Sequence, residues 1–287
     1  MPTGAITEYI NVAQVVLYVF WVFFFFLILY LHRENKREGY PLETGSDRRG
    51  LVQGFPAMPP PKIYDLPHGG TATVSDGKAD RREVKAVPTG PWPGAPLEPT
   101  GNPMVDGVGP AAWAERADEP DRTFEGHVKI VPLRVAEDFQ IAGRDPDPRG
   151  MRVIAADGKV AGTVHDVWVD RSEMMIRYLE VEVHKQSAAD APADGGPAAR
   201  NVLLPMMLAQ VKRMSGRINA DPSVPLNQRL MDGRPFEIRV ASVCAHHFEE
   251  APLRKQPDQV TLLEEDQTMA YFGSGHLYAM DRREPLI

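Results

Sequence analysis

The stretch Val12–Leu31, VAQVVLYVFWVFFFFLILYL, decides how the rest of the chain must be organised. It contains no charged side chain, and its one strongly polar side chain is Gln14 near the outer end. As a helix, its about 20 residues extend roughly 30 Å, which matches the hydrocarbon core of a bilayer. Lipid offers no partner to backbone N–H and C=O groups, and a single segment cannot close a barrel. The stretch therefore predicts a transmembrane helix.

A cleaved signal peptide is the alternative interpretation of this stretch. Signal peptides begin with basic residues, have a shorter apolar core and end at small residues. Met1–Asn11 contains no Lys or Arg, and the run ends in Leu31–Arg37 (LHRENKR) without a cleavage pattern. Because basic residues gather only after the helix, residues 1–11 are expected in the periplasm and the chain beyond Arg33 in the cytoplasm.

The rest of the chain has the composition of a soluble protein, with room for one sizeable domain or two small ones. The net charge of −7 argues against nucleic acid as the main partner, because no basic stripe exists to neutralise phosphates. Cys244 is the one cysteine, so no intrachain disulfide can form. It lies in an apolar run and is predicted to be a buried small residue rather than a nucleophile.

Residues 32–120 are predicted to form an extended Pro- and Gly-rich strap. The segment is rich in the chain's 27 prolines, which disfavour long helices and central strands. A disordered linker is the ordinary interpretation of such a composition. Yet the segment keeps large apolar residues, among them Trp92 and Trp113, which favours an ordered strap lying on a partner protein. One hairpin is expected within it, between Ala72–Val74 and Val84–Ala86.

Short alternating strands indicate a mainly β domain over residues 121–258. In Met175–His184, three apolar residues alternate with Glu180 and Glu182, which predicts one core face and one solvent face. Residues 186–200 are of low complexity and are expected to be a flexible loop. The pattern predicts a small antiparallel barrel of about five or six strands. The candidate strands are Lys129–Leu133, Arg152–Ala155, Val160–Asp170, Met175–His184, Asn201–Met207, Ile218–Ala220 and Phe236–Val240.

Residues 259–287 are predicted to form a short helix and a C-terminal tail. Thr261 and Glu264 have the spacing of a capping box, so the helix should begin at Leu262. It is expected to run to about Phe272 and to stop at Gly273.

A histidine-rich segment before this helix superficially resembles a metal cluster, with His246 and His247 followed by Glu249 and Glu250. Adjacent side chains on a strand point to opposite faces and make a poor chelate. An exposed loop is therefore the preferred interpretation.

Short segments along nearly the whole chain together carry a specific resemblance, although each alone is a weak motif. After the single N-terminal span they are Arg37–Glu43, Leu66–Gly69, Pro99–Pro103, Asp106–Ala111, Gly162–Asp170, Arg177–Val181 and Val260–Asp266. In this order they resemble the H subunit of the purple-bacterial photosynthetic reaction centre. Gly162–Asp170 also resembles the PRC-barrel, a small β-barrel named partly for this subunit.

The resemblance implies one N-terminal transmembrane α-helix, a mainly β cytoplasmic domain of PRC type, an extended Pro-rich segment and a short C-terminal helix. It implies a structural and proton-conducting subunit that lies in the inner, intracytoplasmic membrane and caps the L and M subunits. Such a subunit is not an enzyme. No cofactor is expected on this chain. Bacteriochlorophyll, bacteriopheophytin, quinones and non-haem iron are expected in the partner subunits. An antenna ring and lipids are further expected partners, and the resemblance leaves open whether a cytochrome subunit is bound.

Reduction of a quinone to a quinol needs protons, which must arrive through ionisable groups. Asp170 and Glu173 flank the turn of the predicted hairpin, and Arg177 lies on the return strand. These three match the family's positions near the quinone pathway, where burial and like charges are expected to raise carboxyl pKa values. From the residues alone they are ordinary turn residues and a surface ion pair.

Glu125 and His127 form the second candidate site. A surface histidine beside a carboxylate can take protons from water and pass them on. Some family members carry two histidines here as a proton entrance. In this chain Glu125 occupies the first position and only His127 is retained, and an exposed loop histidine is the alternative.

Two other functions are weighed, of which the first remains an alternative and the second is disfavoured. One is a membrane-tethered PRC-barrel adaptor of a non-photosynthetic assembly, which a colourless preparation would favour. The other is an anchored hydrolase, for which the sequence has no nucleophile elbow or HExxH motif.

Overall fold

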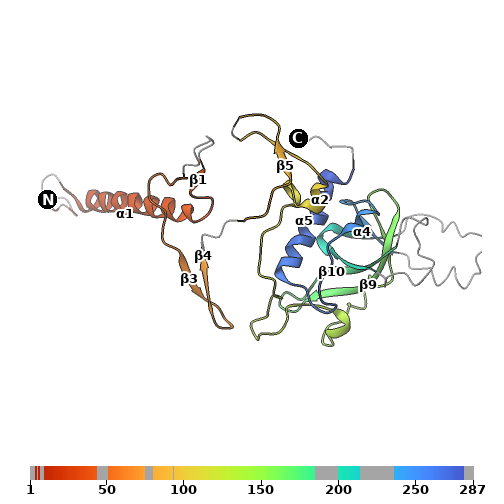
Figure 1. Cartoon of the computed structure of the whole chain (residues 1–287). Coiled ribbons are helices and arrows are strands. Elements are labelled where there is room, and N and C mark those ends of the chain that lie inside the picture. The colour runs from red at the N-terminus through yellow and green to blue at the C-terminus, as the bar shows by residue number, and fades with distance from the viewer. Residues whose placement is uncertain are drawn as a thin grey trace, which may run out of the picture. The chain divides into compact units, whose positions relative to one another are not determined.

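The computed structural model of the chain describes residues 4, 6, 10–43, 51–74, 80–92, 94–184, 200–213 and 236–280. The chain divides into two compact units, 1–81 with 88–96, and 82–87 with 97–287 (Figure 1). The flexible loop predicted at 186–200 lies outside the described residues except for its last position. The strand predicted at Ile218–Ala220 lies wholly outside them.

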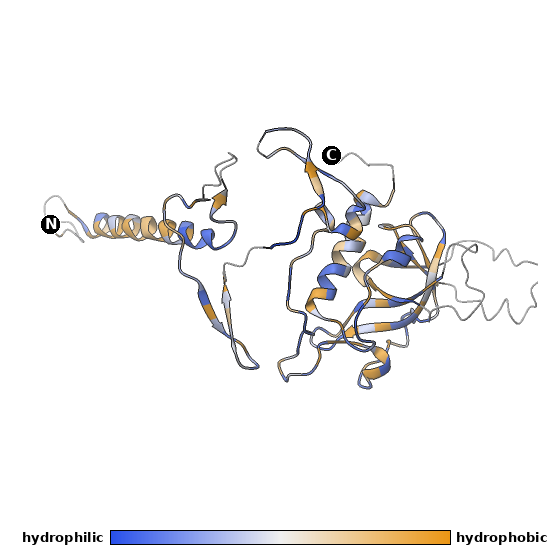
Figure 2. Cartoon of the chain, viewed as in Figure 1, coloured by the Kyte–Doolittle hydropathy of each residue, from blue (hydrophilic) through white to orange (hydrophobic). Residues whose placement is uncertain are grey.

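Helix α1, Val12–Glu34, is the main element of the first unit. Asn11 caps it by accepting a hydrogen bond from the Gln14 backbone N–H at 2.8 Å, and the Gln14 side chain accepts one from the Asn11 N–H at 3.1 Å. None of its residues is buried, and its ribbon has the orange of hydrophobic residues along much of its length in Figure 2. The helix is long and apolar enough to cross a membrane, as the sequence predicts.

The chain turns back at the end of α1 through the 3-10 turn η1, Asn35–Arg37. Lys36 is buried there, and its ammonium donates to the carbonyls of Gln53 at 2.6 Å and Pro56 at 2.7 Å. Further ionic contacts tie the same segment down. We call the whole set the junction bracket, and its contacts are Lys36 with Gln53 and Pro56, Arg37 with Glu34 and Pro60, and Lys62 with Glu34.

Short two-stranded ladders follow the bracket. Strand β1, Leu42–Glu43, pairs with β2, Leu51–Val52, and β3, Lys62–Asp65, pairs with β4, Thr71–Val74. Strand β5, Ala86–Pro88, pairs with β6, Leu97–Pro99. The hairpin expected between Ala72–Val74 and Val84–Ala86 is therefore wrong. Gly69 and Gly70 both have positive φ, at 89° and 87°, and so allow a turn that returns β4 onto β3 instead.

The second unit is built on a seven-stranded sheet in the order β11-β10-β9-β8-β13-β12, with β7 also paired to β9. Its ladders are antiparallel except that of β13 with β8, which is parallel. Among the described strands this path stays open, with β11 and β12 at its ends. The mainly β prediction is confirmed for strands β7 Ile130–Pro132, β8 Arg152–Ile154, β9 Val160–Asp170, β10 Met175–Val183, β11 Asn201–Pro205, β12 Ala209–Arg213 and β13 Phe236–Val240.

Apolar clusters lie on both faces of the central strands, because successive side chains of a strand point to opposite faces. Val167 and Leu179 belong to the larger core cluster. Trp168 and Tyr178, their neighbours in sequence, belong to a smaller cluster with Ile130, Leu203 and Val260. We call this smaller cluster the outer cluster.

The second face of β10 was expected to be exposed to solvent. It is covered instead: Glu180 is only 1% exposed. The prediction fails because the chain around Arg254–Val260 returns over this face, a long-range contact that alternation within one strand cannot reveal.

Helix α5, Leu262–Tyr278, packs against the second unit's core through Tyr271 and Phe272. The predicted capping box is confirmed, since the Thr261 hydroxyl accepts from the Glu264 N–H and the Glu264 carboxylate accepts from the Thr261 N–H. The predicted end at Gly273 is wrong, because the helix continues to Tyr278. Gly275 serves close packing, because a Cβ there would lie 2.3 Å from the Ser242 carbonyl oxygen.

The described part of the unit also contains short helices. They are the α-helices α2, Pro103–Asp106, and α4, His247–Glu250, with the 3-10 turns η2, Gly109–Ala111, η3, Leu133–Val135, and η5, Met206–Leu208.

Candidate functional site

Asp170 closes the turn between β9 and β10 and is fully buried. One carboxylate oxygen accepts from the backbone N–H groups of Ser172 at 2.8 Å and Glu173 at 2.9 Å. The other accepts from Arg177 Nε at 3.1 Å and lies 3.9 Å from Lys129 Nζ. Burial raises the pKa of Asp170, but these donors outweigh burial and hold the pKa below its usual range. The raised pKa expected at this position is not found, and the surroundings of Asp170 favour its ionised form.

Glu173 lies on the outside of the same turn. Its side chain is 52% exposed, and its carboxylate is 2.8 Å from Arg177 Nη2. Arg177 therefore bridges the buried Asp170 and the half-exposed Glu173. The structure brings these three predicted site residues together.

Glu125 and His127 lie on a neighbouring turn, and both side chains are exposed. The turn is closed by a hydrogen bond from the Thr123 N–H to the His127 carbonyl at 2.8 Å. Lys129, two residues further on, connects this turn to the hairpin, because its carbonyl accepts from the Arg171 N–H at 2.9 Å. The two predicted sites are thus adjacent through Lys129.

A cavity of about 480 Å³ opens beside the hairpin. Its charged lining is mixed, and its apolar lining includes several methionines. Asp170 and Arg177 form part of the wall, whereas Glu173, Glu125 and His127 are not among its lining residues. The other charged lining residues are Arg116, Asp121, Lys129, Glu265 and Asp266.

Glu265, on the first turn of α5, is a site residue that the sequence reasoning missed. Its carboxylate accepts a hydrogen bond from the Tyr178 hydroxyl at 2.9 Å. Burial raises the pKa of Glu265 and the nearby Asp121 adds to this, while Tyr178, Arg177 and Lys129 act in the opposite direction without cancelling it. The carboxyl group with a raised pKa is therefore Glu265 on α5, and not Asp170 of the hairpin as expected. In the sequence, the one indication that Glu265 lies on the first turn of a helix was its position directly after Glu264 of the predicted capping box.

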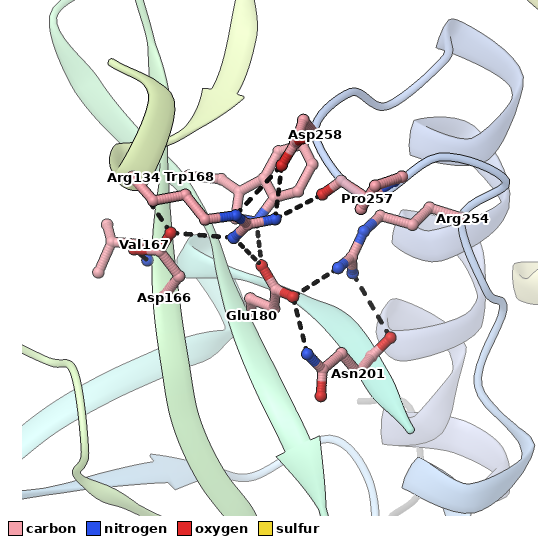
Figure 3. A network of polar contacts seen from close by, with 9 residues as sticks. All are labelled: Arg134, Asp166, Val167, Trp168, Glu180, Asn201, Arg254, Pro257 and Asp258. Atoms are coloured by element: carbon pink, nitrogen blue, oxygen red, sulfur yellow. Dashed lines mark hydrogen bonds and ion pairs between the residues drawn. The ribbon is translucent and has the colours of Figure 1, made fainter. Parts of the chain in front are cut away.

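Glu180 is the centre of a buried ionic network (Figure 3). It lies two residues after Tyr178 on β10, so the two side chains share a face of the sheet. Its carboxylate accepts hydrogen bonds from Arg134, Trp168, Asn201 and Arg254 at 2.5–3.0 Å. Arg134 in turn bonds Asp166 and the segment Pro257–Asp258. Burial raises the pKa of Glu180, but the donors, Arg134 first among them, hold it below its usual range. Glu180 therefore connects the sheet to the chain before α5 through hydrogen bonds that favour its ionised form.

The histidine-rich segment is not the exposed loop that was expected. His247 begins helix α4 and is buried, and its Nδ1 accepts from the Cys244 N–H at 3.1 Å, whereas His246 is exposed. Within the described ranges, no three His, Cys, Asp or Glu residues are grouped to hold a metal ion. Cys244 is buried, as predicted, and burial raises the pKa of its thiol.

Two family models match the chain. The model described as "photosynthetic reaction centre, H-chain N-terminal region" matches residues 4–135. The PRC-barrel domain model matches residues 142–224, which include strands β8 to β12. The first match contains α1, the junction bracket and the turn of Glu125 and His127, and the second contains Asp170, Glu173 and Arg177.

Proposed function

The chain belongs to the H-subunit family of photosynthetic reaction centres, and from that premise we propose that it caps the L and M subunits and conducts protons to the secondary quinone. The family makes it a membrane-anchored subunit that associates with the reaction centre core. The proton role is supported chiefly by one observation. A carboxyl group with a raised pKa, Glu265, shares a cavity with the fixed charges of Asp170 and Arg177.

Each site residue has a distinct part in this proposal. His127 and Glu125, on their exposed turn, take up protons from the cytoplasm, and Glu173 is half-exposed and able to exchange them. Glu265 holds a proton inside the cavity. Asp170 and Arg177 stay charged and set the local field, because their hydrogen bonds favour the ionised forms.

The first test is proton uptake in the purified reaction centre. Glu173→Gln is expected to slow the uptake coupled to the second electron transfer on the order of 100-fold, the usual contribution of a positioned proton carrier. The matched control is Glu115→Gln, an exposed carboxylate on the same unit. Unchanged uptake in the Glu173, Asp170, His127 and Glu265 variants alike would refute the proton path and leave the capping role intact.

The capping role rests on the family and on the exposed apolar surface of the first unit. The side chains of α1 are unburied, and Phe55 and Ile63 of the following segment are 81% and 69% exposed. Surfaces of this kind mark protein or membrane contacts. We propose that this chain itself holds no pigment, and that bacteriochlorophyll, bacteriopheophytin, quinones and non-haem iron reside in the L and M subunits.

Detergent extraction tests the assembly directly. A tag on this chain is expected to bring down a coloured complex whose absorption spectrum shows bacteriochlorophyll, with quinone in the extract. A colourless preparation would favour a membrane-tethered PRC-barrel adaptor instead. We further propose a periplasmic N-terminus and a cytoplasmic second unit, which protease accessibility in sealed vesicles of known sidedness will report.

A further inference from the structure

Tyr178 lies between the apolar outer cluster and the charged cavity. Its ring is 4% exposed and packs in the outer cluster with Trp168, Leu203 and Val260. Its hydroxyl reaches the cavity and donates to Glu265 at 2.9 Å. Buried tyrosines ordinarily satisfy their hydroxyl in this manner, with one apolar end and one polar end.

The position of this hydroxyl is fixed by the sheet. Tyr178 on β10 is paired in register with Trp168 on β9. The Trp168 indole N–H donates to Glu180 at 3.0 Å, and Glu180 is held by Arg134 and Arg254 (Figure 3). Tyr178 therefore packs beside Trp168, whose position is held by its hydrogen bond to Glu180. This packing fixes where the Tyr178 hydroxyl enters the cavity.

The Glu265 carboxylate is brought to the hydroxyl by a separate element. Its neighbour Glu264 caps α5 and also accepts from the Lys255 N–H at 2.7 Å, which fixes the first turn of the helix. The remaining charged groups around Glu265 come from several segments. They are Asp121, which disfavours its anion, Arg177 and Lys129, which favour it, and Arg116, Asp170 and Asp266, which also line the cavity.

We propose that Tyr178 is the positioning residue for proton exchange at Glu265, because its hydroxyl bond stabilises the carboxylate and so lets the bound proton leave again. A hydrogen bond to an ionised acceptor is stronger than one to the neutral acid. Without it, burial and Asp121 would leave Glu265 protonated over a wider pH range. The inference rests on the proposed function only in assigning that proton to quinone reduction.

The proton step leaves the tyrosine unchanged. When Glu265 gains a proton on a carboxylate oxygen, the Tyr178 O–H bond stays intact and only its hydrogen bond weakens. When the proton departs to the next acceptor in the cavity, the bond to the carboxylate is restored. Burial raises the pKa of the Tyr178 phenol above its usual value, so the hydroxyl keeps its own proton throughout.

The carboxylic C=O band in the infrared spectrum measures this equilibrium in the dark, independently of quinone chemistry. In the complex containing the full-length chain, Glu265→Gln is expected to remove one band that titrates with pH. Tyr178→Phe is expected to move that band to higher frequency and to raise its titration midpoint by about one to two pH units, a ten- to hundredfold gain in proton affinity.

Tyr271→Phe is the matched control. It also removes the hydroxyl of a buried tyrosine, one that donates to the His247 carbonyl at 2.8 Å. It should leave the Glu265 band and its midpoint unchanged. If Tyr178→Phe moves the midpoint no further than Tyr271→Phe does, or moves a band that persists in Glu265→Gln, the inference is overturned.

Flash-induced proton uptake separates this inference from the proposed function. If Tyr178→Phe shifts the Glu265 band while Glu265→Gln leaves uptake unchanged, Tyr178 does set the protonation of Glu265. The part of Glu265 in proton delivery then fails by itself. If both the band and the uptake respond, the two proposals stand together.

Discussion

At the scale of single residues, the carboxylates of this chain differ because of the donors that reach them. Glu180 and Asp170 are buried, and Glu265 is partly buried. Glu180 and Asp170 are surrounded by donors and remain ionised, whereas Glu265 has Tyr178 as its hydrogen-bond donor and an opposing Asp121 nearby. The count and charge of the donors, more than burial itself, decide which carboxyl group can carry a proton.

Glu180→Gln is expected to destabilise the second unit by about 3–5 kcal/mol, because it takes the carboxylate partner from the largely buried Arg254 and removes one of the three carboxylates that face Arg134. Urea unfolding followed by circular dichroism measures the change. Glu182→Gln, two residues along the same strand and only half-buried, is the control and should change stability far less. Equal effects of the two substitutions would contradict a structural role for the network.

Asp170→Asn is expected to make stability less dependent on acid pH. The folded pKa of Asp170 is depressed, so its carboxylate stabilises the protein above its unfolded pKa of about 3.9, and that stability is lost as the pH falls through the folded pKa. The difference in unfolding free energy between wild type and variant should therefore be largest near neutral pH and shrink below about pH 4. Exposed Asp138→Asn is the control, and a difference that grows on acidification would contradict this sign.

The sequence predicts some of these residues and not others for a physical reason. Asp170, Glu173 and Arg177 lie on one hairpin, so their proximity follows from the turn itself. Tyr178 and Glu265 are 87 positions apart, and Glu180 and Arg254 are 74 positions apart. Their meeting depends on how α5 and the chain before it return over the sheet, which no local pattern encodes.

At the scale of elements, helix α5 holds a matched pair of glycines. Gly275→Ala would place a methyl group against the Ser242 carbonyl and the Val243 side chain, and it is expected to cost about 1–3 kcal/mol. Gly273→Ala meets nothing within 4 Å and is expected to stabilise the helix by about 0.5–1 kcal/mol. Thermal unfolding of both variants checks the pair, and the same sign for both would refute the packing argument.

The junction bracket gives a second prediction at this scale. Lys36→Met removes the two bonds from the ammonium to the carbonyls of Gln53 and Pro56, so the segment around them should loosen from the end of α1. Spin labels at exposed Arg33 and Phe55 are expected to show a broader distance distribution in this variant. Exposed Glu38→Gln is the control. An unchanged distance distribution in Lys36→Met would show that the Lys36 contacts of the bracket are not needed to hold the segment at the end of α1.

Local patterns predicted the elements themselves well. The apolar run gives α1, the alternation gives β9 and β10 at or within one residue of their ends, and the capping box gives the start of α5. The end of α5 was mispredicted because Gly273 was taken as a stop, whereas the helix continues through Gly275, which packs against Ser242, to Tyr278. The pairing of β3 with β4 was missed for a similar reason, since the turn at Gly69 and Gly70 was overlooked.

At the scale of the whole molecule, the chain consists of two units with different surfaces. The first exposes an apolar helix, whereas the second has its own core and sheet. A fragment from Arg82 onward is therefore expected to stay soluble without detergent and to keep its β-type circular dichroism. The full-length chain should partition into the detergent phase. Aggregation of the fragment, with loss of that signal, would show that the second unit depends on the first.

Fold class at this scale could be predicted, but strand order could not. Alternation identifies strands without specifying partners, so the parallel pairing of β13 with β8 is visible only in the structure. The reason is that β13 follows β8 after a long excursion of chain, and pairing at such separations is decided by the packed core.

The ion pairs of Glu180 have a consequence for variation within the family. Glu180 is buried and pairs with the largely buried Arg254 and with Arg134, which also pairs with Asp166 and Asp258, so replacing Glu180 alone takes the carboxylate partner from Arg254. Such positions are expected to change together or not at all. In an alignment of H subunits, chains that lack the acid at the position of Glu180 should also replace the arginine at position 254, and the pair should show correlated substitution.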